Sequence, residues 1–183
     1  MAVVPSPPLV SVDEYLNSSY HPDVEYVDGA LVERGVSTIA HGHLQLIVGA
    51  HFRSYRKQFR FTPVTEVRTQ IIGRARYRIP DVMLCPHPLP TGKVMDSVPW
   101  AMIEILSPDD KVAEQLERFQ DYKKINVLHV VLLDPERLMA YRFEDGSLLQ
   151  TQFTSLELPT GSVPFDTGAL FQQLVERRNE GQP

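Results

Sequence analysis

Two short apolar runs constrain the fold of this chain more than any other feature of its sequence. The first is WAMIEIL (100–106) and the second is LHVVLLD (128–134). Both are almost continuously apolar, which is typical of strands buried on both faces, because a strand with one face in water alternates apolar and polar residues. A segment with helical periodicity, from about Asp110 to Lys124, separates the two runs. The sequence therefore predicts buried central strands with helices packed against them.

The segments around this centre complete an α/β architecture. Apolar residues at helical spacing and one capping box predict helices over about 11–16, 41–58, 110–124 and 166–178. Asp-Gly pairs predict hairpins that turn at 28–29 and 145–146. Two extended segments, FTPVTEVRTQII and YRIPDVML, are joined by the turn-like GRAR. The order of hairpin, helix, strands, helix, strand and hairpin predicts a mixed β-sheet flanked by helices, an α/β sandwich.

The length and composition favour one globular domain. The chain has 183 residues, of which 43% are hydrophobic and 22% charged. We expect a flexible N-terminal arm over 1–10, a single domain over 11–178 and a flexible tail over 179–183. No apolar run approaches the roughly 20 residues that span a bilayer, so no membrane association is expected. The single Cys85 has no disulfide partner within the chain, which favours a cytoplasmic location.

The net charge of −5 argues against a surface that is basic throughout, but it leaves room for a local basic groove. Two basic clusters are present, one at the end of the 41–58 helix and one before Asp81: Arg53, Arg56, Lys57 and Arg60, then Arg68, Arg74, Arg76 and Arg78. Taken alone, they are typical of a solvated helix end and a charged hairpin. The second cluster gains interest because it leads directly into Asp81.

Two carboxylates interrupt apolar strands. Asp81 follows Pro80 within YRIPDVML, and Glu104 lies inside AMIEIL with apolar neighbours on both sides. A carboxylate in such a place is costly unless it is paired, hydrogen-bonded or bound to a metal. If the two strands are neighbours, their oxygen atoms meet at one point, as a hard divalent cation such as Mg²⁺ requires. Asp81 and Glu104 are therefore the candidate metal ligands.

The helix that follows Glu104 carries a charged face. Lys111, Glu114 and Arg118 are spaced to share one side, beside an apolar stripe of Val112, Leu116 and Phe119. Such a face can supply a cation to a phosphate near the carboxylates. It can equally be a solvated face with a Glu114–Arg118 ion pair. Ser107 or Asp109 is predicted to cap this helix.

Several motifs occur in an order that resembles one known family. They are EYVDG, a helix that opens with a His, PDVML, IEILSP, a helix with a Tyr, and a final VVLLDP. Together they cover the chain from about Val12 to Leu174 and resemble the Uma-two family of restriction-endonuclease-like proteins, within the PD-(D/E)XK superfamily. The resemblance implies a mixed sheet flanked by helices, cleavage of DNA phosphodiester bonds with Mg²⁺ or Mn²⁺, and often a homodimer. It assigns the metal carboxylates to Asp81 and Glu104.

The resemblance also exposes two departures, in which Glu114 replaces the family's aspartate and Arg118 replaces its lysine. The superfamily's usual lysine, two residues after the glutamate, is Leu106 here, and the family pattern S-P-x5-D-x3-K-x3-Y places Glu114, Arg118 and Tyr122 at its later positions. Arginine keeps the positive charge of the lysine but does not give up its proton at ordinary pH. Lys111 is therefore kept as a candidate substitute.

Two further residues match the family pattern. Glu25 matches the glutamate of its E-x-x-D-G segment, where it would assist the metal directly or through water, and His41 matches its helical histidine. A zinc site at His41, His43 and His51 is not favoured, because the three lack a clustered further ligand. Two hypotheses follow: a metal-dependent nuclease, or a catalytically degenerate nuclease fold that binds nucleic acid or a protein without cutting.

Overall fold

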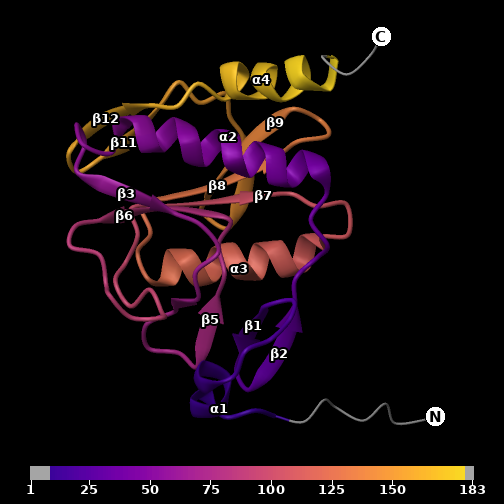
Figure 1. The fold of residues 1–183 in the computed structure, drawn as a ribbon, viewed down its shortest axis with the longest axis vertical. Helices are drawn as coiled ribbons and strands as arrows, with labels where there is room; N and C mark the ends of the chain where they lie inside the picture. The colour runs from indigo at the N-terminus through magenta and orange to yellow at the C-terminus, as the bar shows by residue number, and fades with distance from the viewer. Residues whose placement is uncertain (1–8, 180–183) are drawn as a thin grey trace.

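The computed structural model describes residues 9–179, which fold around a six-stranded sheet of order β10-β9-β8-β7-β6-β3 (Figure 1). The two apolar runs form its centre as β7 (Ala101–Ile105) and β8 (His129–Asp134), which pair in parallel. The other neighbouring pairs of this sheet are antiparallel. These remaining strands are β3 (Phe61–Val64), β6 (Val82–Pro86), β9 (Met139–Glu144) and β10 (Ser147–Gln150). The predicted mixed sheet is confirmed.

Helices cover both faces of this sheet. In Figure 1, α2 (Ile39–Tyr55) and α4 (Thr167–Asn179) lie above it and α3 (Val112–Lys124) lies below it. Leu44 and Phe52 of α2 share one apolar core with α4, while Phe119 and Tyr122 of α3 belong to the core on the opposite face. Because both faces are covered, β7 and β8 have no face in water, as their apolar sequences indicate. In the part of the chain that the structure describes, no helix is long and apolar enough to cross a membrane.

A smaller sheet of order β2-β1-β5-β4 lies beyond α3 (Figure 1). Its strands are β1 (Val24–Val27), β2 (Ala30–Glu33), β4 (Thr69–Gln70) and β5 (Arg76–Arg78), and α1 (Val12–Asn17) packs beside it. The hairpin turn at Asp28-Gly29 and the Ser11 cap of α1 are confirmed. Of the predicted arm and tail, residues 1–8 and 180–183 lie outside the described residues. Val10 is held to the hairpin, since its N–H donates to the Gly29 carbonyl at 2.8 Å.

The segments 61–72 and 77–84 are divided between the two sheets. β3 pairs with β6 in the large sheet, whereas β4 pairs with β5 in the small one. The chain leaves the large sheet after Val64, where Glu66 takes a left-handed backbone conformation (φ 52°), and returns to it at residues 79–81. This crossing places Asp81 where the two sheets meet.

Two local predictions are wrong, and one hairpin was not predicted. The helix cap is Lys111, which makes no side-chain cap hydrogen bond, so neither Ser107 nor Asp109 caps α3. Val112 is 70% exposed and does not belong to the apolar stripe, because it lies in the first turn of α3, at the rim of the fold. A further hairpin, β11 (Ser155–Leu158) with β12 (Gly161–Pro164), was not predicted, since its short strands carry little periodicity.

Candidate active site

The two candidate metal carboxylates lie at one end of two adjacent strands. Asp81 immediately precedes β6, Glu104 lies in β7, and the antiparallel ladder between these strands ends at the Val82–Ile103 pair. Each of the two is only 2% exposed. Both line one polar cavity of about 20 Å³, which is room for a single water molecule or ion. Asp81 and Glu104 therefore border the same small space, which is the arrangement that a shared metal ion would need.

Asp81 is held in its charged form by three groups. Arg34 Nη2 donates to Oδ1 at 2.6 Å, the Ile105 N–H donates to Oδ2 at 2.8 Å, and His41 Nε2 lies 3.2 Å from Oδ2. Burial acts to raise the pKa of Asp81, but His41, Arg34 and the Ile105 N–H outweigh it and hold this pKa below its usual value. Asp81 is therefore an anion at neutral pH.

The pKa of Glu104 is shifted in the opposite direction, toward the protonated form. Tyr122 Oη donates to its Oε1 at 2.5 Å. Burial, followed by the neighbouring charge of Asp81, raises the pKa of Glu104 to about 8. Two carboxylates whose pKa values are pushed apart are characteristic of active sites, although buried structural networks show the same effect.

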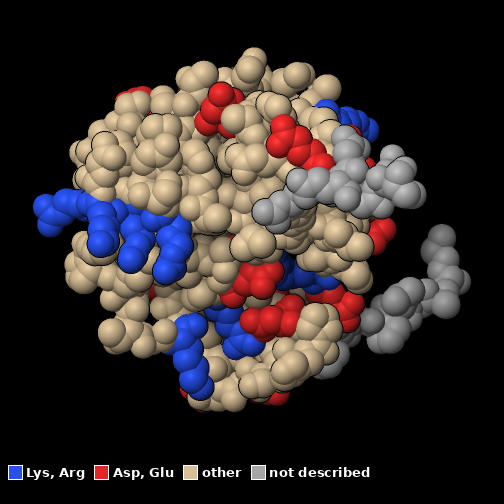
Figure 2. Space-filling model, turned by 45° about the horizontal axis from the view of Figure 1, so that its top comes forward, with Lys and Arg blue, Asp and Glu red and all other residues tan. Residues whose placement is uncertain are grey.

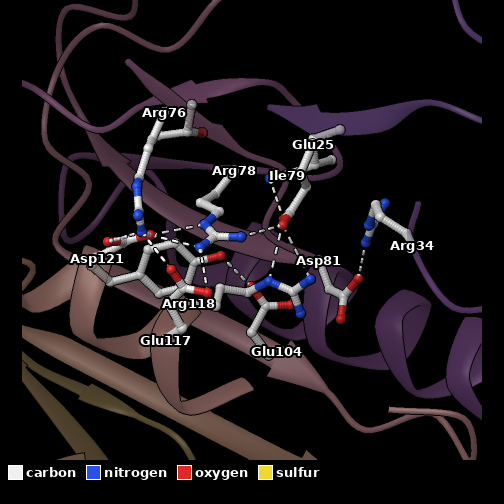
Figure 3. Close-up of polar contacts among 12 residues, drawn as sticks. Glu25, Arg34, Arg76, Arg78, Ile79, Asp81, Glu104, Glu117, Arg118 and Asp121 are labelled. Atoms are coloured by element: carbon white, nitrogen blue, oxygen red, sulfur yellow. Dashed lines mark hydrogen bonds and ion pairs between the residues drawn. The ribbon is translucent and has the colours of Figure 1, made fainter. Parts of the chain in front are cut away.

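Arg118 enters the cavity from α3 and pairs with Glu25 of β1 (Figure 3). Arg118 Nη2 donates to Glu25 Oε2 at 3.3 Å, and Nε lies 3.2 Å from Oε1 without hydrogen-bond geometry. Glu25 also accepts from Arg78 Nη1 at 2.8 Å and from the Ile79 N–H at 3.1 Å. Burial would raise the pKa of Glu25, but these arginines lower it below its usual value. Glu25 is fully buried and is not among the cavity-lining residues, so it positions Arg118.

The second basic cluster forms part of a buried ion-pair network (Figure 3). Arg78 contacts Asp121 of α3 at 2.7 Å, and Arg76 contacts the same carboxylate at 3.0 Å. Arg76 also reaches Glu117 and Asp28. These contacts join the small sheet to α3. They pair the two arginines with carboxylates of the protein itself. Arg76 and Arg78 therefore do not belong to an open basic groove.

Lys111 and Glu114 lie outside the cavity. Lys111 Nζ lies 2.8 Å from Glu114 Oε1, and the Lys111 side chain is 76% exposed. The predicted alternative, an ion pair between Glu114 and Arg118, is wrong, because each of them has another partner. The three residues do not share one face, since Lys111 precedes the helix and Arg118 points inward. Of the two candidate cations, Arg118 is the one that lines the cavity.

Two further cavity residues were not predicted from the sequence. Arg34 follows β2 and binds Asp81 from 47 positions away. Gln115 of α3 is buried, lines the cavity, and has an Oε1 atom without a hydrogen-bond partner. Both lie in segments whose sequence resembles an ordinary polar surface. Only the folded structure, which brings them to the cavity beside Asp81 and Glu104, identifies them as site residues.

The donor set fits a magnesium-type ion better than a zinc-type ion. Within residues 9–179, no group of three or more His, Cys, Asp or Glu side chains is arranged to hold a metal. Magnesium commonly takes one or two protein carboxylates and fills its other positions with water and substrate phosphate. Asp81 and Glu104 supply such a pair, and the unpartnered Gln115 Oε1 adds a third hard oxygen beside the same cavity.

Comparison with known proteins agrees with this fold. Residues 12–169 match the Uma2 family, whose description is "Putative restriction endonuclease". A crystal structure described as a putative nuclease belonging to DUF820, from Anabaena variabilis, superposes with a TM-score of 0.75 at 19% sequence identity, covering 90% of this chain and 99% of that one. At this identity the likeness shows the fold alone. No curated protein matches the chain. The resemblance seen in the sequence motifs is confirmed.

Proposed function

Because the chain belongs to the Uma2 family of restriction-endonuclease-like proteins, we propose that it hydrolyses phosphodiester bonds of DNA with Mg²⁺ or Mn²⁺. The observation that carries the proposal is the pair of buried carboxylates, Asp81 and Glu104, that line one polar cavity. Membership of the family supports a nuclease-like activity, and the chemistry of the donor set favours a divalent ion.

In this proposal Asp81 and Glu104 would hold the ion, and Gln115, whose Oε1 has no hydrogen-bond partner and which lines the same cavity, would bind one of its waters. The ion, when bound, supplies positive charge at the phosphate and makes a water molecule more acidic. Arg118 stabilises negative charge that develops on the phosphate, because its planar guanidinium binds phosphate oxygens in pairs. Arg118 does not accept a proton, so the proton of the attacking water leaves to solvent or to a phosphate oxygen. Lys111, exposed and paired with Glu114, has no part in the site.

The test is cleavage of supercoiled plasmid and of single-stranded DNA with Mg²⁺ or Mn²⁺. Asp81→Ala and Glu104→Ala should each abolish cleavage, and Asp81→Asn and Glu104→Gln should do so with less disturbance of packing. Glu114→Ala is the matched control, since it removes an exposed carboxylate from the neighbouring helix. Thermal unfolding of each variant shows that it is folded. Activity that survives at wild-type level in both alanine variants would overturn the proposal.

A second function, binding without cutting, is favoured by a different observation. Two arginines, Arg34 and Arg118, already place positive charge beside the carboxylates. Such internal cations reduce the electrostatic gain from a metal. Calorimetric titration with Mn²⁺ separates the two functions: a folded protein that takes up no Mn²⁺ at millimolar concentration, yet binds DNA, has the second function.

A further inference from the structure

A groove of about 430 Å³ runs between α2 and the edge strand β3, next to the carboxylate site. Its lining includes Gly42, Gln45, Gly49 and Arg53 of α2. Gln45 links it to the site, because Gln45 Nε2 donates to the backbone carbonyl of Asp81 at 3.0 Å. Arg53 lies about two helical turns further along the same helix. This groove, called here the α2 groove, therefore extends from the catalytic carboxylates toward the first basic cluster.

The chain segment that forms most of the α2 groove contains no acidic residue. Residues 34–65 hold five Lys or Arg residues and no Asp or Glu, although the whole chain carries a net charge of −5. Beyond the groove, Lys57 and Arg60 are exposed, as is Arg53. Figure 2 shows Lys and Arg side chains gathered in one patch on the surface. Glu66 also lines the groove, and its Oε1 lies 3.9 Å from Arg34 Nη1, so an arginine outside the lining partly offsets its charge. Charge of this kind favours a polyanion.

Two glycines of α2, one in its first turn and one near its middle, have no role in the packing of the chain itself. A Cβ atom added at Gly42 or at Gly49 would meet nothing within 4 Å. Each glycine destabilises a helix relative to alanine, because the unfolded chain is more flexible there. On the open side of a helix, a missing side chain allows another backbone to approach closely. Both glycines line the α2 groove, so a ligand backbone bound in the groove could approach α2 closely at these two positions.

Other occupants fit the groove less well. A peptide strand added to the free edge of β3 would meet Pro63, which has no N–H to donate to a ladder. A second copy of this chain, packed through α2, would bring the basic cluster with Arg53 and Lys57 close to another acid-free segment of the same sign. A phosphodiester backbone carries the negative charge that the basic segment attracts, and it can lie close to α2 where the two glycines have no side chains.

We propose that the α2 groove holds the phosphodiester backbone of the nucleic acid on one side of the bond that is cut. The inference rests on the proposed nuclease function and names the surface by which the substrate is held. Arg53 and Lys57 contact phosphates, and Gly42 and Gly49 leave room for the strand against α2. Gln45 lines the groove that would hold the nucleic-acid strand and also binds the backbone of Asp81, so it links the bound strand to the carboxylate site.

The test measures binding without cleavage. Fluorescence anisotropy follows a labelled 20-base-pair DNA duplex and the matching single strand, in EDTA, at several salt concentrations. Arg53→Ala/Lys57→Ala should weaken binding at least about tenfold at low salt and reduce the log–log salt slope by about 1.8, since each phosphate contact contributes about 0.9. The matched control is Arg137→Ala/Arg142→Ala, which removes the same charge from residues that do not line the groove.

A second variant tests the shape of the groove without changing its charge. Gly49→Gln fills the space, and its thermal midpoint should equal or exceed that of the wild type, because glutamine is the better helix former. Its DNA affinity should nevertheless fall several-fold. A variant that is more stable but binds less well marks a glycine kept for a ligand.

The outcomes separate this inference from the proposed function. Wild-type affinity in both Arg53→Ala/Lys57→Ala and Gly49→Gln, with plasmid cleavage intact in the wild type, overturns the groove and leaves the nuclease standing. A wild-type protein that binds neither DNA form at low salt overturns both. If Gly49→Gln instead converts a dimer to a monomer in light scattering while DNA affinity is unchanged, the groove belongs to a second copy and the inference fails.

Discussion

Replacing Glu104 with glutamine should stabilise the protein at alkaline pH and leave its stability nearly unchanged at acidic pH. Burial and the charge of Asp81 raise the pKa of Glu104 from 4.5 to about 8 in the folded protein. Between these values the folded state binds more protons than the unfolded state. The free energy of unfolding therefore falls as the pH rises through this window. Glutamine keeps the size of the side chain and an acceptor for Tyr122, but it has no proton to lose.

The magnitude follows from the size of the shift. From 4.5 to about 8 is about 3.5 pKa units, and at about 1.4 kcal/mol per unit the upper limit is about 5 kcal/mol. Relaxation and water entry reduce this figure, so we expect glutamine to add roughly 2–5 kcal/mol at pH 9. Asp81 and Glu25 act in the opposite sense, since their lowered pKa values cost stability only as the pH falls below about 4. The two effects therefore occupy different pH ranges.

Urea unfolding in EDTA at pH 5, 6, 7, 8 and 9 measures the effect for the wild type, Glu104→Gln and the exposed control Glu114→Gln. The wild type and the control should lose stability together above about pH 5, while Glu104→Gln should not. Parallel curves for the wild type and Glu104→Gln over the whole range would refute the reasoning, because they would mean that Glu104 titrates as it does in the unfolded chain.

Three further predictions follow from the same site. Arg118→Lys should raise any metal-dependent plasmid cleavage, since an amine can give up its proton; equal or lower activity would mean that Arg118 does not stand in the place of the family's lysine. Arg78→Ala should lower the free energy of unfolding by about 3–5 kcal/mol in urea, because the buried carboxylates of Glu25 and Asp121 each lose one of their cations, and a loss below about 1 kcal/mol would contradict this. Tyr122→Phe should extend the pH-dependent loss of stability to higher pH, because the hydrogen bond from Tyr122 lowers the pKa of Glu104 in the folded protein; an unchanged pH curve would count against that bond.

Local features of the sequence determined most of the secondary structure and pointed to the two carboxylates that we propose as metal ligands. The Asp-Gly turns, the Ser11 cap and the apolar runs of β7 and β8 are confirmed, because turn chemistry and burial on both faces leave a pattern in neighbouring residues. Asp81 and Glu104 were found in the same way, since a carboxylate inside an apolar strand stands out without knowledge of its partner.

The tertiary structure alone decided which charges meet. Arg118 pairs with Glu25 from 93 positions away, and Arg34 reaches Asp81 from 47 positions away. It also decided that segments adjacent in the chain join different sheets, and that α2 and β3 leave a groove beside the site. The physical reason is that periodicity reports whether a residue is buried, whereas the partner of a charge depends on how distant elements pack. The sequence by itself therefore determined the elements and the two acids, and packing determined the cations that surround them.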